Sequence, residues 1–394
     1  MNPKRVYLDW AAATPLLPAA YEAMTPYLRG NFGNPSAIHQ EGQVCRQAVE
    51  DARVKVAGAV QVRPEYITWT SGGTEGNNLA IFGVVESCKR QGRSYESMTV
   101  ITTKIEHPSV SEAFAALERQ KVKVRYARVT EVGKVDLEHV RSLLDDSVVL
   151  LSVALINSEI GTVQPVRAIN KMLHAAEVIF GTQIFLHVDA AQAPLWINCQ
   201  FDALAADLVT FDAAKCCGPK GVGMLARSRR AALVAVVHGG GQESGLRPGT
   251  ENVAGIVGAA VAIAEAQSSW KERSEQVRAV CDEAMVHIQN ELPQALINGA
   301  TNDDRVANNI NLSIPGLDTE FTAVVLDTAG FAISTKSACS GAGGGASTVV
   351  LETTTDLARA ASTLRITLGP DTSLEDIKSL TEVLKRHVKQ MSQY

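Results

Sequence analysis

The sequence lacks an apolar run long enough to cross a membrane as a helix. Its longest such stretch, residues 148–156, contains a serine, whereas a span needs about 20 apolar residues. The N-terminus also lacks the apolar core of a signal peptide, because Lys4 and Arg5 lead straight into a strand-like segment. Net charge is small as well: 37 basic and 42 acidic residues give −5, which provides no general attraction to nucleic acid or to an anionic membrane.

Aromatic residues are scarce, at 5% of the 394 residues, so the core must be built mainly from Ala, Val, Leu and Ile. The seven cysteines are odd in number and form no C-x-x-C pair. This pattern argues against a disulfide framework and a metal site, and we expect a protein of the reducing cytoplasm. With 46% hydrophobic and 20% charged residues, the chain reads as an ordinary globular protein of about two domains.

Short β-type runs alternate with helical patterns through most of the chain. The expected strands are residues 66–70, 99–103, 122–126, 148–155, 184–188, 207–211 and 222–226. Helical patterns lie between them, for example at 137–144 and 166–179. The run 148–155 is apolar on both faces, as in a strand covered by helices on both sides. The alternation predicts the α/β fold class, with a large domain whose mostly parallel seven-stranded sheet is covered by helices.

The pattern changes after about residue 255. Two long helical stretches are followed by shorter strands and helices, which predict a smaller α+β C-terminal domain; the expected helices are 253–267, 274–291, 319–328 and 374–390, and the expected strands are 308–313, 331–335 and 363–368. We therefore expect an N-terminal segment, residues 1–15, packing with the small domain. We expect residues 16–255 to form the large domain and residues 256–394 to form the small one, which carries Cys339.

Three features follow the ends of expected strands, where open α/β sheets bind ligands. Residues 70–78, Thr-Ser-Gly-Gly-Thr-Glu-Gly-Asn-Asn, precede a helical run and can present backbone N–H groups to a phosphate. Asp189 follows the run 184–188, and Lys215 follows the run 207–211. Alone, each has an ordinary explanation as a capped turn, a helix cap or a surface lysine. Together they are the three anchors of pyridoxal phosphate, which needs a phosphate cradle, an acid for its pyridinium nitrogen and an imine-forming lysine.

Further motifs lie in a fixed order along nearly the whole chain: Glu-His at 106–107, Asn-Ser-Glu-Ile-Gly at 157–161, Gly-Pro-Lys-Gly at 218–221, Arg-Pro-Gly-Thr at 247–250 and Ser-Ala-Cys-Ser at 337–340. With the three features above, they resemble the cysteine desulfurases of the IscS/NifS branch, within the class-V aminotransferases. The resemblance implies a pyridoxal-phosphate-dependent transferase of fold type I. It also implies conversion of L-cysteine to L-alanine, with transfer of the sulfur to an acceptor protein for iron–sulfur cluster assembly or tRNA thiolation.

The resemblance also implies roles for individual residues. The implied catalytic residues are Cys339, which carries the persulfide, Lys215, which forms the imine, and His107, which stacks on the pyridine ring. Thr250 is expected to reach the phosphate of a neighbouring subunit, so a homodimer is implied. The implied cofactor-binding residues are Gly73, Thr74, His107, Asn157, Asp189, Gln192, Lys215 and Thr250, and the implied substrate-binding residues are Asn157 and Arg365.

Cys339 also has a reading independent of the resemblance. It is followed by Gly-Ala-Gly-Gly-Gly-Ala-Ser at residues 341–347, a stretch that favours no single backbone conformation. An unremarkable loop cysteine would fit this setting. So would a nucleophile that enters a site and then carries sulfur to an acceptor.

Two positions depart from the family pattern, which has Ser-x-His-Lys where this chain has Asp212-Ala213-Ala214-Lys215. The serine and histidine ordinarily donate to the phosphate, whereas alanine cannot donate and aspartate repels it. Two like charges about 4 Å apart repel by about 4 kcal/mol at an effective dielectric constant near 20. We therefore expect weaker cofactor binding, with Asp212 turned away to cap the turn or to pair with a base. Cys216 and Cys217 replace the family's aromatic residue and read as structural thiols.

Other functions remain open at this point. Within the same fold, a selenocysteine lyase or a transaminase would fit, although a transaminase has no need of Cys339. Residues 221–226 spell the nicotinamide fingerprint G-x-G-x-x-A, but their Val, Met and Leu content predicts a strand rather than the start of a helix. A cofactor-poor scaffold protein is supported only by Asp212 and Ala214. A visible absorbance band from the imine separates pyridoxal phosphate chemistry from the last two readings.

Overall fold

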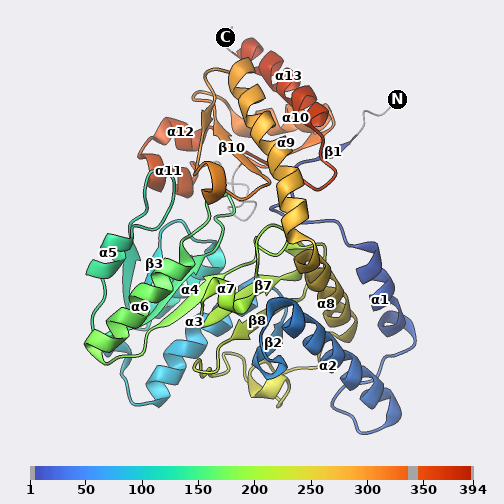
Figure 1. The fold of residues 1–394 in the computed structure, drawn as a ribbon, viewed down its shortest axis with the longest axis vertical. Helices are drawn as coiled ribbons and strands as arrows, with labels where there is room; N and C mark the ends of the chain where they lie inside the picture. Colours follow the sequence, from blue (N-terminus) through green and yellow to red (C-terminus); the bar gives the residue numbers. More distant parts are fainter. Residues whose placement is uncertain (1–4, 336–344, 392–394) are drawn as a thin grey trace.

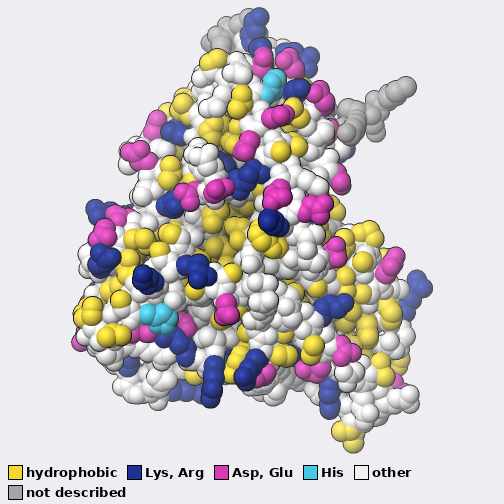
Figure 2. Space-filling model, viewed as in Figure 1, with side chains coloured by type: hydrophobic (Ala, Val, Ile, Leu, Met, Phe, Trp, Pro, Cys, Tyr) yellow, Lys and Arg dark blue, Asp and Glu magenta, His cyan; other side chains and the backbone are white. Residues whose placement is uncertain are grey.

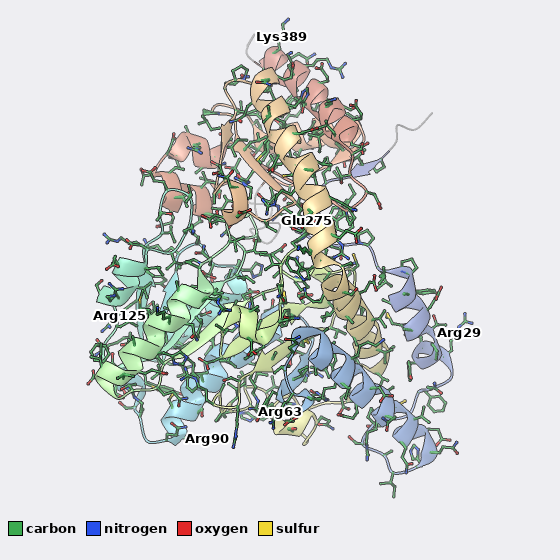
Figure 3. All side chains as sticks on the ribbon, viewed as in Figure 1. Arg29, Arg63, Arg90, Arg125, Glu275 and Lys389 are labelled. Carbon is green, nitrogen blue, oxygen red and sulfur yellow. The ribbon has the colours of Figure 1, made fainter. Side chains whose placement is uncertain are left out.

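The structure is a computed structural model that describes residues 5–335 and 345–391. Within this part of the chain, a large α/β part lies below a smaller part in Figure 1. The helices α8 (Val253–Ser268) and α9 (Trp270–Glu291) meet at an angle of 67°. Figure 1 shows α9 rising from the large part into the small one, and Glu275 marks its lower half in Figure 3.

The large part is organised around a sheet of seven strands in the order β2-β8-β7-β6-β5-β3-β4. β8 runs antiparallel to both its neighbours, and the other six strands share one direction. The predicted seven-stranded, mostly parallel sheet is therefore confirmed. Each strand lies within one residue of its expected bounds: β2 (Ile67–Thr70), β3 (Thr99–Thr103), β4 (Lys123–Ala127), β5 (Val148–Ala154), β6 (Phe185–Asp189), β7 (Leu208–Asp212) and β8 (Gly223–Arg227).

Helices cover both faces of this sheet. One face packs against α3 (Gly73–Arg90) and α4 (Pro108–Arg119), and the other packs against α2 (Gln40–Val60), α6 (Val166–Phe180) and α8. β5 shows why its sequence is apolar on both faces: Val149 packs in the core beside α3 and α4, and Leu151 packs in the core on the other face. The remaining helices of the large part are α1 (Pro18–Arg29), α5 (Leu137–Ser142) and α7 (Phe201–Leu204).

The small part contains a three-stranded antiparallel sheet in the order β12-β10-β9. Its strands are β9 (Leu296–Ile297), β10 (Asn309–Ser313) and β12 (Thr363–Thr367), and its helices are α9, α10 (Thr319–Thr328), α11 (Thr348–Thr354), α12 (Leu357–Ala361) and α13 (Leu374–Met391). The N-terminal strand β1 (Val6–Tyr7) pairs in parallel with β11 (Phe331–Ala332). The start of the chain is thus joined to its last third.

Some bounds differ from the sequence-based expectation. The strand expected at 331–335 ends at Ala332, because the backbone of Ser334 instead exchanges hydrogen bonds with Arg365 of β12. The helix expected from residue 274 begins at Trp270. The described residues contain no single helix that is long and apolar enough to span a membrane, although α8 and α9 pass that test as a bent pair. On the face shown in Figure 2, charges of both signs are interspersed.

Candidate active site

One cavity lies at the carboxyl ends of the parallel strands and is closed by residues of the small part. Its empty space, including the portion open to solvent, is about 800 Å³. It brings together eight of the residues expected in the site: Gly73, Thr74, His107, Asn157, Asp189, Gln192, Lys215 and Arg365. Thr250 is exposed and does not line it, and Cys339 lies outside the described residues.

Asp189 is the last residue of β6, and its side chain is almost entirely buried, with the residue 7% exposed. Its carboxylate accepts hydrogen bonds from Asn77 Nδ2 at 2.7 Å and from the Ala191 N–H at 3.0 Å. Asn77 lies on the first turns of α3 and also donates to Ser109 Oγ. The acid is therefore held in a fixed orientation at the floor of the cavity, as its expected role requires.

Lys215 ends the short 3₁₀ turn Ala213–Lys215 that follows β7. Its Nζ donates to the carbonyl oxygens of Ala11, at 3.1 Å, and of Ala12. Gln192 Nε2 donates to the same Ala11 oxygen at 2.9 Å. One backbone carbonyl therefore brings the lysine amine and the glutamine amide to a common point on the cavity wall.

His107 is the N-cap of α4. Its Nδ1 accepts from the Ser109 N–H at 3.1 Å and contacts Ser109 Oγ at 2.8 Å. Burial lowers the pKa of His107. The charge of Lys215 lowers it further, whereas the Asp189 carboxylate raises it. The imidazole is therefore neutral at pH 7 and can take up a proton.

Glu106, beside His107, is half-buried and also lines the cavity. Its two carboxyl oxygens accept from Thr103 Oγ1 at 2.6 Å and from the Ala154 N–H at 2.7 Å. Burial raises the pKa of Glu106 to about 7, and the nearby Asp189 charge adds to the effect. A second carboxyl group therefore lies close to that of Asp189.

Asn157 and Arg365 lie where the large and small parts meet. The amide of Asn157 is engaged by backbone: Nδ2 donates to Ile105 O, and Oδ1 accepts from the N–H groups of residues 159 and 160. It can reach a ligand only through its second Nδ2 hydrogen. Arg365 is 2% exposed and donates to Ser158 O at 3.0 Å and to Asp9 Oδ1 at 2.8 Å. Its buried Nε has no hydrogen-bond partner within the described chain.

The N-terminus of α3 lies at the end of the cavity where the cofactor phosphate is expected. Gly72 has φ 152°, a conformation that favours glycine, and the helix begins at Gly73. The Asp212 carboxylate accepts from the Gly73 N–H at 3.1 Å and from the Ala214 N–H at 3.0 Å. Asp212 therefore caps the turn, as expected, but it faces the helix end rather than turning away from it.

The N-terminal segment forms one wall of the cavity. Besides the two carbonyls that Lys215 contacts, Thr14 Oγ1 donates to Ala214 O at 3.0 Å and accepts from the Cys217 N–H at 2.7 Å. Cys216 is buried, which raises the pKa of its thiol well above the ordinary value. In the described chain no group of His, Cys, Asp and Glu residues is arranged to hold a metal ion.

Sequence reasoning gave no role to Asn77, Glu106 or Asp9. Each is a polar residue beside a predicted site residue in space, and Asn77 and Glu106 also lie within quoted motifs. Asn77 carried no sequence signal of its own, because its burial, at 1% exposed, shows only in the structure. For Asp9 there was no signal, because its partner Arg365 lies 356 residues away.

Comparison with known proteins bears on this arrangement. Residues 6–380 match the family described as Aminotransferase class-V. The chain belongs to this family. Among its relatives, the "Cysteine desulfurase IscS" of Dictyoglomus turgidum is 36% identical over 388 residues, covering 98% of this chain and 95% of the relative. The protein of the same name from Methylococcus capsulatus is 36% identical over 389 residues, covering 98% of this chain and 93% of the relative.

Solved structures of the family resemble the fold closely. A NifS-like protein superposes with a TM-score of 0.89 at 30% identity, covering 98% of this chain and 99% of the other. A structure described as SspA in complex with cysteine superposes with a TM-score of 0.76 at 29% identity, covering 92% of this chain and 99% of the other. These matches confirm the predicted family and fold class.

The residues of the cavity fit the family's cofactor, pyridoxal phosphate, with one qualification. A buried carboxylate and a lysine amine lie in the same cavity, as the ring nitrogen and the aldehyde require. At the other end, a Cβ on Gly73 would lie 3.3 Å from Asp212 Oδ2, a tight contact beside that carboxylate. The ring end of the site therefore fits the cofactor fully, and the phosphate end already contains an anion.

Proposed function

We propose that this chain is a pyridoxal-phosphate-dependent cysteine desulfurase. It converts L-cysteine and the Cys339 thiol into L-alanine and a Cys339 persulfide, so that sulfur moves from one thiol to another without an external oxidant. The observation that supports this most strongly is the cavity in which Asp189, His107, Lys215 and Arg365 meet from separate segments of a chain whose relatives are named cysteine desulfurases.

The residues of the cavity divide the work by position. Asp189 would hold the ring nitrogen, and Lys215 would form the covalent link to the cofactor. When bound, pyridoxal phosphate supplies the electron sink that allows the Cα–H bond of an amino acid to break. His107, neutral at pH 7, can accept and return a proton beside Asp189. Arg365 would bind the substrate carboxylate, since its buried Nε has no partner in the described chain.

We also propose a homodimer. Apolar side chains are exposed between α1 and the start of α2, among them Phe32 at 80% and Ile38 at 86%. A surface hollow is lined by Pro35, Ser36, Arg46, Val49 and Glu50 on one side and by residues 241–243 and 251 on the other, next to Thr250 in the sequence. A second copy seated there would cover the apolar residues and bring Thr250 near the partner's site. The sulfur acceptor would be a protein of iron–sulfur assembly or tRNA thiolation, in the cytoplasm.

The covalent link is tested by borohydride reduction of the purified protein. Peptide mapping should find the reduced cofactor on Lys215 and not on the exposed Lys220, five residues away. Label on Lys220, or the absence of label, contradicts the assignment.

Sulfur transfer is tested with Cys339→Ala. This variant should keep the cofactor's visible band and its response to cysteine, but lose nearly all sulfide release in the presence of a thiol reductant. The matched control is Cys217→Ala, which removes a half-buried thiol outside the proposed reaction. This variant should keep its sulfide release. Undiminished sulfide release by Cys339→Ala would instead support a transaminase or a simple lyase.

A further inference from the structure

The Asp212 carboxylate lies in the cavity at the N-terminus of α3. The first turn of an α-helix presents N–H groups without intrahelical acceptors, and these favour an anion. In α3, the Gly73 N–H already donates to Asp212 Oδ2 at 3.1 Å. A side chain of this protein has therefore taken one of the donors that a ligand phosphate would use.

Asp212 is held in this place by a second contact. Its other oxygen, Oδ1, accepts from the Ala214 N–H at 3.0 Å, so the carboxylate bridges the end of β7 and the start of α3. Turning it away would break both bonds and leave two N–H groups to find other acceptors. The carboxylate is therefore a fixed part of the cradle.

The nearby positive charges are already engaged. Arg247 Nε donates to Glu75 Oε1 at 3.0 Å, and Glu75 also accepts from the Ser71 N–H at 2.6 Å. Lys215 Nζ donates to backbone carbonyls on the opposite wall. Any phosphate entering the cradle thus meets an additional carboxylate whose charge these cations do not neutralise.

We propose that Asp212 is a resident anion of the α3 cradle and that it lowers this site's preference for a phosphorylated cofactor over the unphosphorylated form. The inference rests on the proposed function, because it concerns the cofactor of that same site. Asp212 is then a specificity-determining residue. Because of it, the phosphate contributes less to cofactor binding, and the ring and the covalent link at Lys215 contribute more.

The test measures preference rather than activity. Protein freed of cofactor is titrated with 4-deoxypyridoxine and its 5′-phosphate, which lack the aldehyde and cannot link to Lys215. The phosphorylated form should bind within about tenfold of the unphosphorylated one to the original protein. Asp212→Asn, which removes the charge, and Asp212→Ser, which restores the family's residue, should each raise the preference at least tenfold, about 1.4 kcal/mol.

The matched control is Asp356→Asn. Asp356 also caps a helix through its carboxylate but is exposed in the small part, and its loss should leave the preference unchanged. Thermal melts give a second readout that does not depend on the ring: inorganic phosphate should raise the melting temperature of Asp212→Ser more than that of the original protein. A strong preference in the original protein that neither Asp212 variant alters overturns the inference.

Failure here is distinguishable from failure of the proposed function. If pyridoxal and pyridoxal phosphate both give a reducible link at Lys215 while the Asp212 variants change no preference, only the inference falls. If neither compound forms that link, the proposed function falls and the inference falls with it.

Discussion

Replacing Glu106 by glutamine should make folding stability less dependent on pH between 5 and 8. In the folded protein, burial raises the pKa of Glu106 to about 7 from a reference of 4.5. Glutamine has nearly the same shape. Its carbonyl oxygen can accept from the Ala154 N–H, and its amide can donate to Thr103 Oγ1, so both contacts of the carboxyl are kept.

The direction in which stability changes with pH follows from the number of protons that the folded and unfolded states bind. Below pH 4.5, Glu106 is protonated in both the folded and the unfolded chain and adds no pH dependence. Between pH 4.5 and about 7 the folded state keeps a proton that the unfolded state has released, so stability falls as pH rises. At about 1.4 kcal/mol for each pH unit, Glu106 costs about 3 kcal/mol above pH 7, and about 2–3 kcal/mol of this develops between pH 5 and 8.

The assay is urea unfolding of cofactor-free protein at pH 5, 6, 7 and 8, followed by tryptophan fluorescence. Between pH 5 and 8 the original protein should lose about 2–3 kcal/mol more than Glu106→Gln. Glu283→Gln, at an exposed position of α9, is the matched control and should follow the original protein. If the free energies of Glu106→Gln and the original protein change in parallel with pH, the buried carboxyl does not titrate in this range and the reasoning is refuted.

Two further substitutions test charged groups elsewhere. Arg365→Lys should lower kcat/KM for cysteine about 10- to 100-fold, mainly through KM, because hydrogen bonds to charged groups contribute about 1.5–3 kcal/mol. The control Asp9→Asn leaves the guanidinium in place and should lower kcat/KM less. Arg53→Met should cost about 3–5 kcal/mol in urea unfolding, because within the described residues it leaves the buried Glu243 carboxylate with the Trp69 N–H as its one remaining donor. Arg53→Met combined with Glu243→Leu should recover much of that loss. An additive double variant would show that the pair is not coupled.

The central sheet was predictable because its signal is local. Residues 148–154 are apolar at every position except Ser152, and burial on both faces explains this directly. The G-x-G-x-x-A sequence at 221–226 was correctly predicted as a strand, and Gly223 begins β8. The antiparallel direction of β8 was not foreseen, since strand direction depends on the connection and not on the residues of the strand.

The site was predictable where a motif carries its chemistry, and not where contacts span the chain. Asp189 and Lys215 follow strands, so their shared cavity follows from sheet topology. The orientation of Asp212 could not be derived from charge alone: repulsion from a phosphate favours turning away, but two backbone N–H groups hold the carboxylate in the cradle. The pairing of Arg365 with Asp9 depends on the docking of both chain ends.

Residues 9–14 form one wall of the cavity, and Asp9 in this segment is held by Arg365 near the other end of the chain. The cavity is therefore complete only after most of the chain has been made. On the ribosome, Asp189 and Lys215 are joined to the growing chain well before β12 exists, and Arg365 cannot yet hold Asp9. At roughly 5–20 residues per second, the stretch that separates Lys215 from Arg365 takes on the order of ten seconds to synthesise. During that interval the nascent chain has the lysine but not the enclosed cavity around it. We therefore expect a protein truncated before β12 to lack the Arg365–Asp9 contact and to hold the proposed cofactor less tightly than the full chain, even if its central sheet folds.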